Sequence, residues 1–273
     1  MSEAINLHSD ARDVLMETSR TFFIPISLLS PGLKETVTSA YLCMRAIDEI
    51  EDHSELQAET KSNLLRSISK LLQKPFNHNE LMEIFYPYKS ILPDVTLRLG
   101  DWIKLCPPAI AENVLDATST MAKGMADWVL KEWRIKNEDD LNQYTYYVAG
   151  LVGVMLSDIW KWHDATETDE SLAIAFGRGL QSVNILRNRT EDLERGVDFF
   201  PDGWELDDMF MYARRNLALA DVYLENIKPG PILDFCKIPI ALAHGTLDAL
   251  TEGKEKMSRT AVTEIVSNVV SKQ

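Results

Sequence analysis

Two acidic side chains, Asp48 and Asp52, lie four residues apart in the run 48–52, so a helix would bring them onto one face. Followed back along the chain, that face also carries Arg45 and Tyr41. Two like charges at this spacing weaken a helix slightly, and a cation bound by both would reverse the effect. A solvated acidic helix end is the ordinary explanation of such a pair. The pair therefore indicates a metal site only if a second set of polar side chains supports it.

A second polar stripe follows the segment 179–192, which has helical periodicity. Its members, spaced by three and four residues, are Gln181, Asn184, Asn188 and Asp192. Carboxylate and amide oxygens in this arrangement suit a hard cation such as Mg²⁺. Arg187 and Arg195 flank the stripe, and their guanidinium groups match phosphate oxygens. The two stripes predict the walls of one Mg²⁺–diphosphate site, with a buried structural network as the alternative.

Two shorter segments add to this pattern. In the segment 144–153, which begins at Tyr144, Gly150 and Gly153 each cost a helix about 1 kcal/mol relative to alanine. Close helix packing and room for a bulky ligand both explain these glycines. The segment 19–23 sets two hydroxyls and a guanidinium beside two phenylalanines, which suits phosphate at one end and hydrocarbon at the other, although a plain helix terminus explains it as well.

The elements that must position these residues are helices, because apolar residues recur every three or four positions and alternating strand patterns are missing. The predicted helices span about 8–20, 33–53, 57–74, 78–90, 108–135, 139–163, 169–195, 205–227, 231–250 and 258–271. Pro25 and Pro31 are expected to interrupt the chain after the first helix. We expect one all-α domain over residues 1–273, with the helices 139–163 and 169–195 at its centre.

Composition excludes several classes of protein. A net charge of -14 argues against nucleic acid as a partner. The three cysteines are far apart in the chain, which favours a reducing compartment, and we expect a cytoplasmic protein. We expect neither a signal peptide nor a membrane-spanning segment, although an apolar substrate or product could bring the protein to a membrane transiently.

These four motifs, in this order, resemble those of the squalene/phytoene synthase family, the head-to-head prenyltransferases with the α-helical isoprenoid synthase fold. The resemblance covers about residues 10 to 205, and the run 147–153, Tyr-Val-Ala-Gly-Leu-Val-Gly, looks especially like a squalene synthase. It implies a helical bundle around a central active-site cavity. No motif of the last 70 residues or so adds to it.

The resemblance implies a role for each matching residue. Asp48 and Asp52 match the first aspartate-rich motif, which ligates Mg²⁺, and Asp192 matches the last aspartate of the second. The positions that match diphosphate contacts are Ser19, Thr21, Tyr41 and Arg45. Those that match the second wall are Gln181, Asn184 and Arg187. Tyr144 matches a tyrosine beside the reacting carbocation, and Phe22 matches an aromatic residue of the prenyl pocket.

One position departs from the family pattern, which has aspartate where this chain has Asn188. An amide oxygen ligates Mg²⁺ without adding charge, and single-substrate terpene cyclases are similar in using asparagine in their second metal motif. The expected metal ligands are therefore Asp48, Asp52, Asn184, Asn188 and Asp192, holding two or three Mg²⁺ with the substrate diphosphate.

The first hypothesis for function is head-to-head condensation of two prenyl diphosphates, most simply farnesyl diphosphate, with Asp48, Asp52, Arg45, Tyr144 and Arg187 as the catalytic residues. The second, motivated by Asn188, is an enzyme that hydrolyses one prenyl diphosphate to its alcohol or cyclises it. A non-catalytic prenyl-lipid carrier comes third, and a purely structural bundle last. The sequence leaves the use of NADPH open, because no glycine-rich dinucleotide motif is present and reductases of this family are not expected to have one.

Overall fold

The computed structural model describes residues 2–270, without the side chains of residues 2–6 and of Arg20. Within that range the chain is all-α, with no β-strand, as predicted. It divides into two compact units, residues 1–132 and 133–273. Glu132 and Trp133, at the border between them, both have a φ of 51°, which ends helical geometry there. That the whole chain forms one domain stays a prediction.

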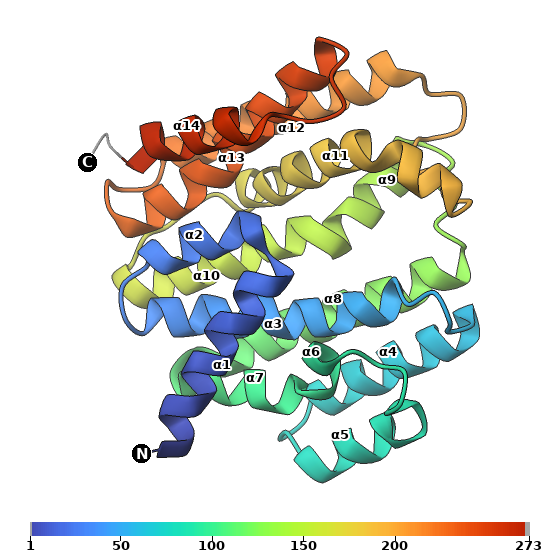
Figure 1. Ribbon diagram of the computed structural model, residues 1–273, viewed down its shortest axis with the longest axis vertical. Helices are drawn as coiled ribbons and strands as arrows, with labels where there is room; N and C mark the ends of the chain where they lie inside the picture. Colours follow the sequence, from blue (N-terminus) through green and yellow to red (C-terminus); the bar gives the residue numbers. More distant parts are fainter. Residues whose placement is uncertain (1, 271–273) are drawn as a thin grey trace. The chain divides into compact units, whose positions relative to one another are not determined.

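The first unit contains eight α-helices in its described part (Figure 1). They are α1 (Ser2–Thr18), α2 (Arg20–Leu28), α3 (Leu33–Glu51), α4 (Ala58–Leu72), α5 (His78–Phe85), α6 (Asp94–Leu97), α7 (Leu99–Leu105) and α8 (Pro108–Leu130), with a 3₁₀ turn at Tyr86–Tyr88. Helix α3 packs against α1, α2, α4, α6, α7 and α8. This central position explains why the apolar side of α3, including Leu42, Ile47 and Ile50, is fully buried.

The second unit is built around α11 (Glu170–Glu194), as its apolar composition predicts. The other helices are α9 (Glu138–Thr145), α10 (Leu151–Asp164), α12 (Leu206–Glu225), α13 (Pro231–Thr251) and α14 (Arg259–Val270), and the π-helix η2 (Tyr146–Gly150) joins α9 to α10. Helix α11 packs against α9, η2, α10, α12 and α13. Its long polar stripe therefore belongs to the most central helix of this unit.

Most predicted helices lie within a few residues of the observed ones, and the main errors have local causes. The segment after the first helix is itself helical, because the Ser19 side chain accepts a hydrogen bond from the Phe22 amide (3.0 Å) and caps α2. Pro25 lies inside this helix rather than ending it. The prediction also lacks α6 and α7, and it gives 139–163 as one uniform helix although η2 interrupts it.

Helix α11 approaches both α10 and η2 so closely that backbone touches backbone. A Cβ atom on Gly153 would lie 1.9 Å from the Ala173 carbonyl oxygen, and one on Gly177 would lie 2.0 Å from the Ala149 carbonyl oxygen. Only glycine fits at such distances. Close packing, the first of the two explanations open for the sequence, therefore accounts for Gly153. At Gly150 the nearest atom would be a methyl carbon of Ile174 at 3.1 Å, a milder constraint.

Candidate active site

The acidic pair occupies the C-terminal end of α3. Asp48 lies in its last turn, and Asp52 is the C-cap, whose amide donates a hydrogen bond to the Asp48 carbonyl oxygen (2.9 Å). Asp52 is exposed, whereas the Asp48 side chain keeps 30% of its surface. Carboxylates at a helix C-terminus meet the negative end of the helix dipole, so this pair is unfavourable unless a positive charge joins it.

Arg45 supplies part of that positive charge. Its Nη1 atom lies 2.6 Å from Asp48 Oδ2, and its Nη2 atom also pairs with Glu49. The Arg45 Nε atom is buried and has no hydrogen-bond partner within the described residues. A buried donor without an acceptor is costly, so this atom is a fit for an oxygen-rich ligand such as a phosphate. Sequence reasoning missed Glu49, although its i,i+4 spacing from Arg45 was readable.

Electrostatics mark Asp48 as the unusual member of the pair. Burial, followed by the neighbouring Asp52 carboxylate, raises the pKa of Asp48 to about 7, against an ordinary value of 3.8, while Arg45 opposes the shift. A carboxyl group poised near neutral pH is ionised by an approaching cation.

Three predicted substrate contacts gather where α1, α2 and α3 meet. The Tyr41 hydroxyl donates to the Thr18 carbonyl oxygen (3.2 Å) and also bonds the Ser19 side chain. The ring of Phe22 lies 6.1 Å from that of Tyr41, centroid to centroid. Burial raises the pKa of Tyr41, so the hydroxyl stays a neutral donor. Thr21, predicted beside them, is exposed in the first turn of α2.

The second stripe lies along α11 as predicted. Asn184 Nδ2 lies 3.5 Å from Gln181 Oε1, and Asn188 Oδ1 accepts from Arg187 Nε at 3.1 Å. Asp192 is buried in the last turn, where its Oδ1 atom accepts from Arg195 Nη2 at 2.5 Å. The three amides and the carboxylate thus lie along one helix. Carboxylate and amide oxygens are ligands that Mg²⁺ accepts in proteins.

Tyr144 lies in the last turn of α9, directly before the π-helix η2. It is buried, and its ring stacks on that of Phe199, with centroids 4.8 Å apart and planes 17° apart. Single π-turns inside helices are frequent at functional sites. The sequence analysis missed Phe199, although an aromatic pair, Phe199 and Phe200, follows the second stripe closely.

The two α3 carboxylates do not make a complete metal shell by themselves. Within the described residues, no three His, Cys, Asp or Glu side chains converge closely enough to hold an ion. Mg²⁺ usually keeps several waters and takes one or two carboxylates, with substrate phosphates completing its shell. The Asp48–Asp52 pair and the orphaned Arg45 donor fit that mode of binding.

The comparisons with known proteins fit these motifs. The sequence pattern described as "Squalene/phytoene synthase" matches residues 15–204, which include every predicted site residue. The chain belongs to the squalene/phytoene synthase family. Among curated family members, the squalene synthase of Dictyostelium discoideum is 32% identical over 87% of this chain and 62% of its own length. That of Eremothecium gossypii is 30% identical over 91% of this chain and 63% of its own.

Solved structures of family members share the fold. A complex of TcSQS with a ligand superposes with a TM-score of 0.79 at 20% identity, covering 97% of this chain and 86% of that one. A dehydrosqualene synthase in complex with a ligand gives 0.70 at 17% identity, covering 99% and 98%. These likenesses confirm the helical fold. The chain spans about three fifths of the length of the curated squalene synthases that it matches.

Among the helices that the structure describes, none is both long enough and apolar enough to cross a bilayer.

Proposed function

We propose that this chain is a Mg²⁺-dependent enzyme that ionises a prenyl diphosphate. The observation that carries the proposal is the Asp48–Asp52–Arg45 group of α3, in a chain that belongs to the squalene/phytoene synthase family. Two carboxylates, one with its pKa near neutrality, and a guanidinium with a buried unpaired Nε suit a metal-bound diphosphate.

Under this proposal the α11 stripe binds the same diphosphate. Asp48 and Asp52 would hold Mg²⁺ from one helix, and Asn184, Asn188 and Asp192 would do so from the other. Bound Mg²⁺ supplies positive charge that neutralises the departing diphosphate. Arg45 and Arg187 add fixed positive charge to the same leaving group, so that little reorganisation accompanies bond cleavage.

The first proposed reaction is head-to-head condensation of two farnesyl diphosphates. Ionisation of one substrate leaves an allylic cation, which the second substrate attacks to give a cyclopropyl intermediate with loss of a proton. The buried Tyr144, stacked on Phe199, is proposed to face that cation and to assist the proton's departure to released diphosphate. Phe22 and Tyr41 contribute aromatic surface that keeps water from the hydrocarbon. Loss of the second diphosphate leaves a second cation, which loses a proton to give a dehydrosqualene- or phytoene-type product or accepts a hydride from NADPH to give a squalene-type product.

A second candidate is favoured by Asn188. Its amide oxygen adds no charge to the proposed metal shell, and in the structure it accepts a hydrogen bond from Arg187. Weaker Mg²⁺ binding by the α11 stripe favours ionisation of a single substrate, whose cation is then captured by water or closes into a ring. The products would then be farnesol or a cyclic terpene.

One experiment separates these candidates. The protein is incubated with farnesyl or geranylgeranyl diphosphate, with and without Mg²⁺ and NADPH; released diphosphate is measured and organic extracts are analysed by mass spectrometry. A C30 or C40 hydrocarbon supports condensation, and a difference between the NADPH arms reports reduction. A C15 alcohol or cyclic terpene supports the second candidate. Mg²⁺-dependent release that survives Asp48→Asn contradicts the proposed metal site, and no release from either substrate favours a lipid-binding protein.

A further inference from the structure

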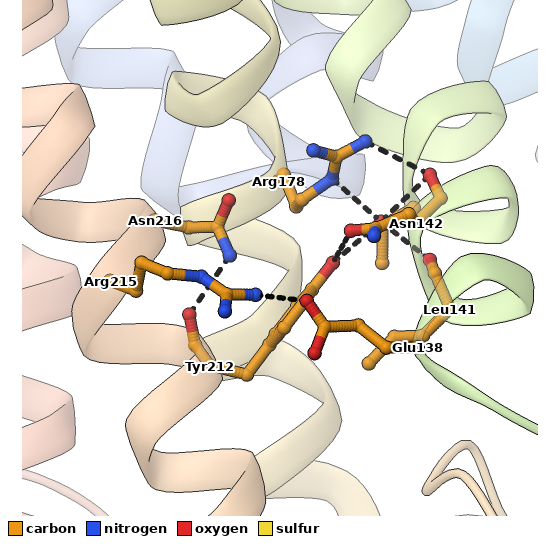
Figure 2. Close-up of polar contacts among 8 residues, drawn as sticks. Glu138, Leu141, Asn142, Arg178, Tyr212, Arg215 and Asn216 are labelled. Atoms are coloured by element: carbon orange, nitrogen blue, oxygen red, sulfur yellow. Dashed lines mark hydrogen bonds and ion pairs between the residues drawn. The ribbon is translucent and has the colours of Figure 1, made fainter.

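The last turn of α9, which carries Tyr144, is held by side chains from α11 and α12 (Figure 2). Two of the contacts come from Arg178 of α11. Its Nη2 atom donates to the Asn142 carbonyl oxygen (3.0 Å), and its Nε atom donates to Thr145 Oγ1 (3.2 Å). The two bonded residues lie on either side of Tyr144 in the chain, so one guanidinium fixes both ends of the segment that presents the tyrosine.

The bonding of Arg178 is unusual for an arginine. Within the part of the chain that the structure describes, it forms no ion pair with a carboxylate, and its hydrogen-bond partners are a carbonyl and a hydroxyl oxygen. The Asn142 carbonyl oxygen also accepts a hydrogen bond from the Tyr146 amide, so Arg178 adds a second donor to it at the junction of α9 and η2. Arg178 is thus bonded to this junction rather than to an acidic partner.

Tyr212 of α12 completes the network. Its hydroxyl donates to Asn142 Oδ1 at 2.9 Å and lies 3.3 Å from Thr145 Oγ1, while Asn216 Nδ2 donates to the Tyr212 carbonyl oxygen at 2.9 Å. Burial raises the pKa of Tyr212, which keeps the hydroxyl protonated and able to donate. The α9 turn is therefore fixed from two helices by groups of defined geometry.

This bonding matters because η2 begins one residue after Thr145. The Tyr146 amide is shared between the Asn142 and Gln143 carbonyl oxygens, so the hydrogen-bond ladder is irregular where this turn meets η2. Arg178 also precedes Gln181 by three residues on α11, and so extends the polar stripe by about one turn. The same helix therefore carries the stripe and the group that holds the tyrosine turn.

We propose that Arg178 is a positioning residue that sets the place of Tyr144 relative to the polar stripe of α11. The effect of Arg178 on reaction rate rests on the proposed function. Its effect on structure, in which Arg178 fixes the Tyr144 turn through Asn142 and Thr145, does not depend on any reaction.

The structural content is tested with 3-fluorotyrosine placed at position 144 and read by ¹⁹F NMR. Arg178→Leu should shift or broaden that resonance, and Arg178→Lys should shift it less, because lysine can keep one of the two bonds. Arg214→Leu is the control, since Arg214 also lies in this unit but donates to Thr251. An unchanged resonance in a folded Arg178→Leu variant overturns the inference. If that variant does not fold, Thr145→Val, which removes the Nε acceptor together with the other hydrogen bonds of the Thr145 hydroxyl, should shift or broaden the same resonance.

The kinetic content is tested on diphosphate release. Arg178→Leu should lower kcat about 10- to 100-fold, as a misplacement of about 1 Å would, and leave KM within about threefold. Added guanidinium should restore part of the kcat of Arg178→Ala, and Arg214→Leu should stay within about twofold of the parent protein. A wild-type kcat in Arg178→Leu contradicts the positioning role. If the parent protein releases no diphosphate, the proposed function fails, and the ¹⁹F result alone decides the role of Arg178.

Discussion

Asp48 should destabilise the metal-free protein whenever its carboxylate is ionised, because burial and the Asp52 charge oppose that form. The perturbation that exposes this effect is Asp48→Asn, which keeps the side-chain shape and removes the titration. The folded state holds a proton on Asp48 up to about pH 7, whereas the unfolded chain releases it near 3.8. Wild-type stability should therefore fall as pH rises through this window, and the variant should lack that fall.

The magnitude follows from the two pKa values. The gap between 3.8 and about 7 corresponds to at most about 4 kcal/mol of free energy of unfolding. About half of it develops between pH 5.5 and pH 8, because the folded-state pKa of about 7 lies inside that range. Solvent reaches a side chain that is 30% exposed, so these energies are upper bounds. The stability advantage of Asp48→Asn should thus grow by up to about 2 kcal/mol over that range, or up to about 4–8 °C in Tm.

The assay is thermal unfolding of both proteins in EDTA at pH 5.5 and pH 8. Comparing the two pH values cancels any constant effect of losing the contact between Arg45 and Asp48. Asp116→Asn, an exposed carboxylate of α8, is the matched control and should show no growing advantage. A difference in Tm between Asp48→Asn and wild type that is constant, or that shrinks as pH rises, would refute the reasoning.

Three further predictions concern the second unit. Asn188→Asp adds a charged ligand to the proposed shell and should raise the share of condensed C30 product over C15 alcohol in the organic extract; an unchanged ratio would show that this position does not select the reaction. Gly153→Ala should lower the free energy of unfolding by about 2 kcal/mol or more, because its Cβ would meet the Ala173 carbonyl oxygen at 1.9 Å. Gly150→Ala, which meets only a methyl group at 3.1 Å, should be within about 1 kcal/mol of wild type, and equal losses in the two variants on chemical denaturation would contradict the packing argument.

The sequence predicts the long helices well because each has a strong amphipathic pattern and a local end signal. Helix α3 begins and ends within two residues of its prediction, and α11 within one. Helix α2 was missed because Pro25 looks like a breaker, whereas the Ser19 cap outweighs it. Short helices such as α6, with four residues, carry too little periodicity to be recognised.

The residues of the candidate site also fall into those that the sequence predicts and those that it does not. Asp48, Asp52 and the α11 stripe could be proposed from the sequence because their spacing along one helix is visible in the chain. The partners of Tyr144 could not, because Phe199 and Arg178 reach it or its turn through tertiary contacts between different elements. The raised pKa of Asp48 was equally unreadable, since it comes from burial, which only the packing around α3 determines.

The central claim is that the α3 pair and the α11 stripe bind the same Mg²⁺–diphosphate group. A double-mutant cycle tests it: Mg²⁺-dependent binding of the unreactive farnesyl thiodiphosphate is measured by calorimetry for wild type, Asp48→Asn, Asp192→Asn and the double variant. A shared ion cluster predicts a coupling energy of about 1 kcal/mol or more between the two substitutions. Losses that add within about 0.5 kcal/mol, or full Mg²⁺-dependent binding by the double variant, would contradict the claim.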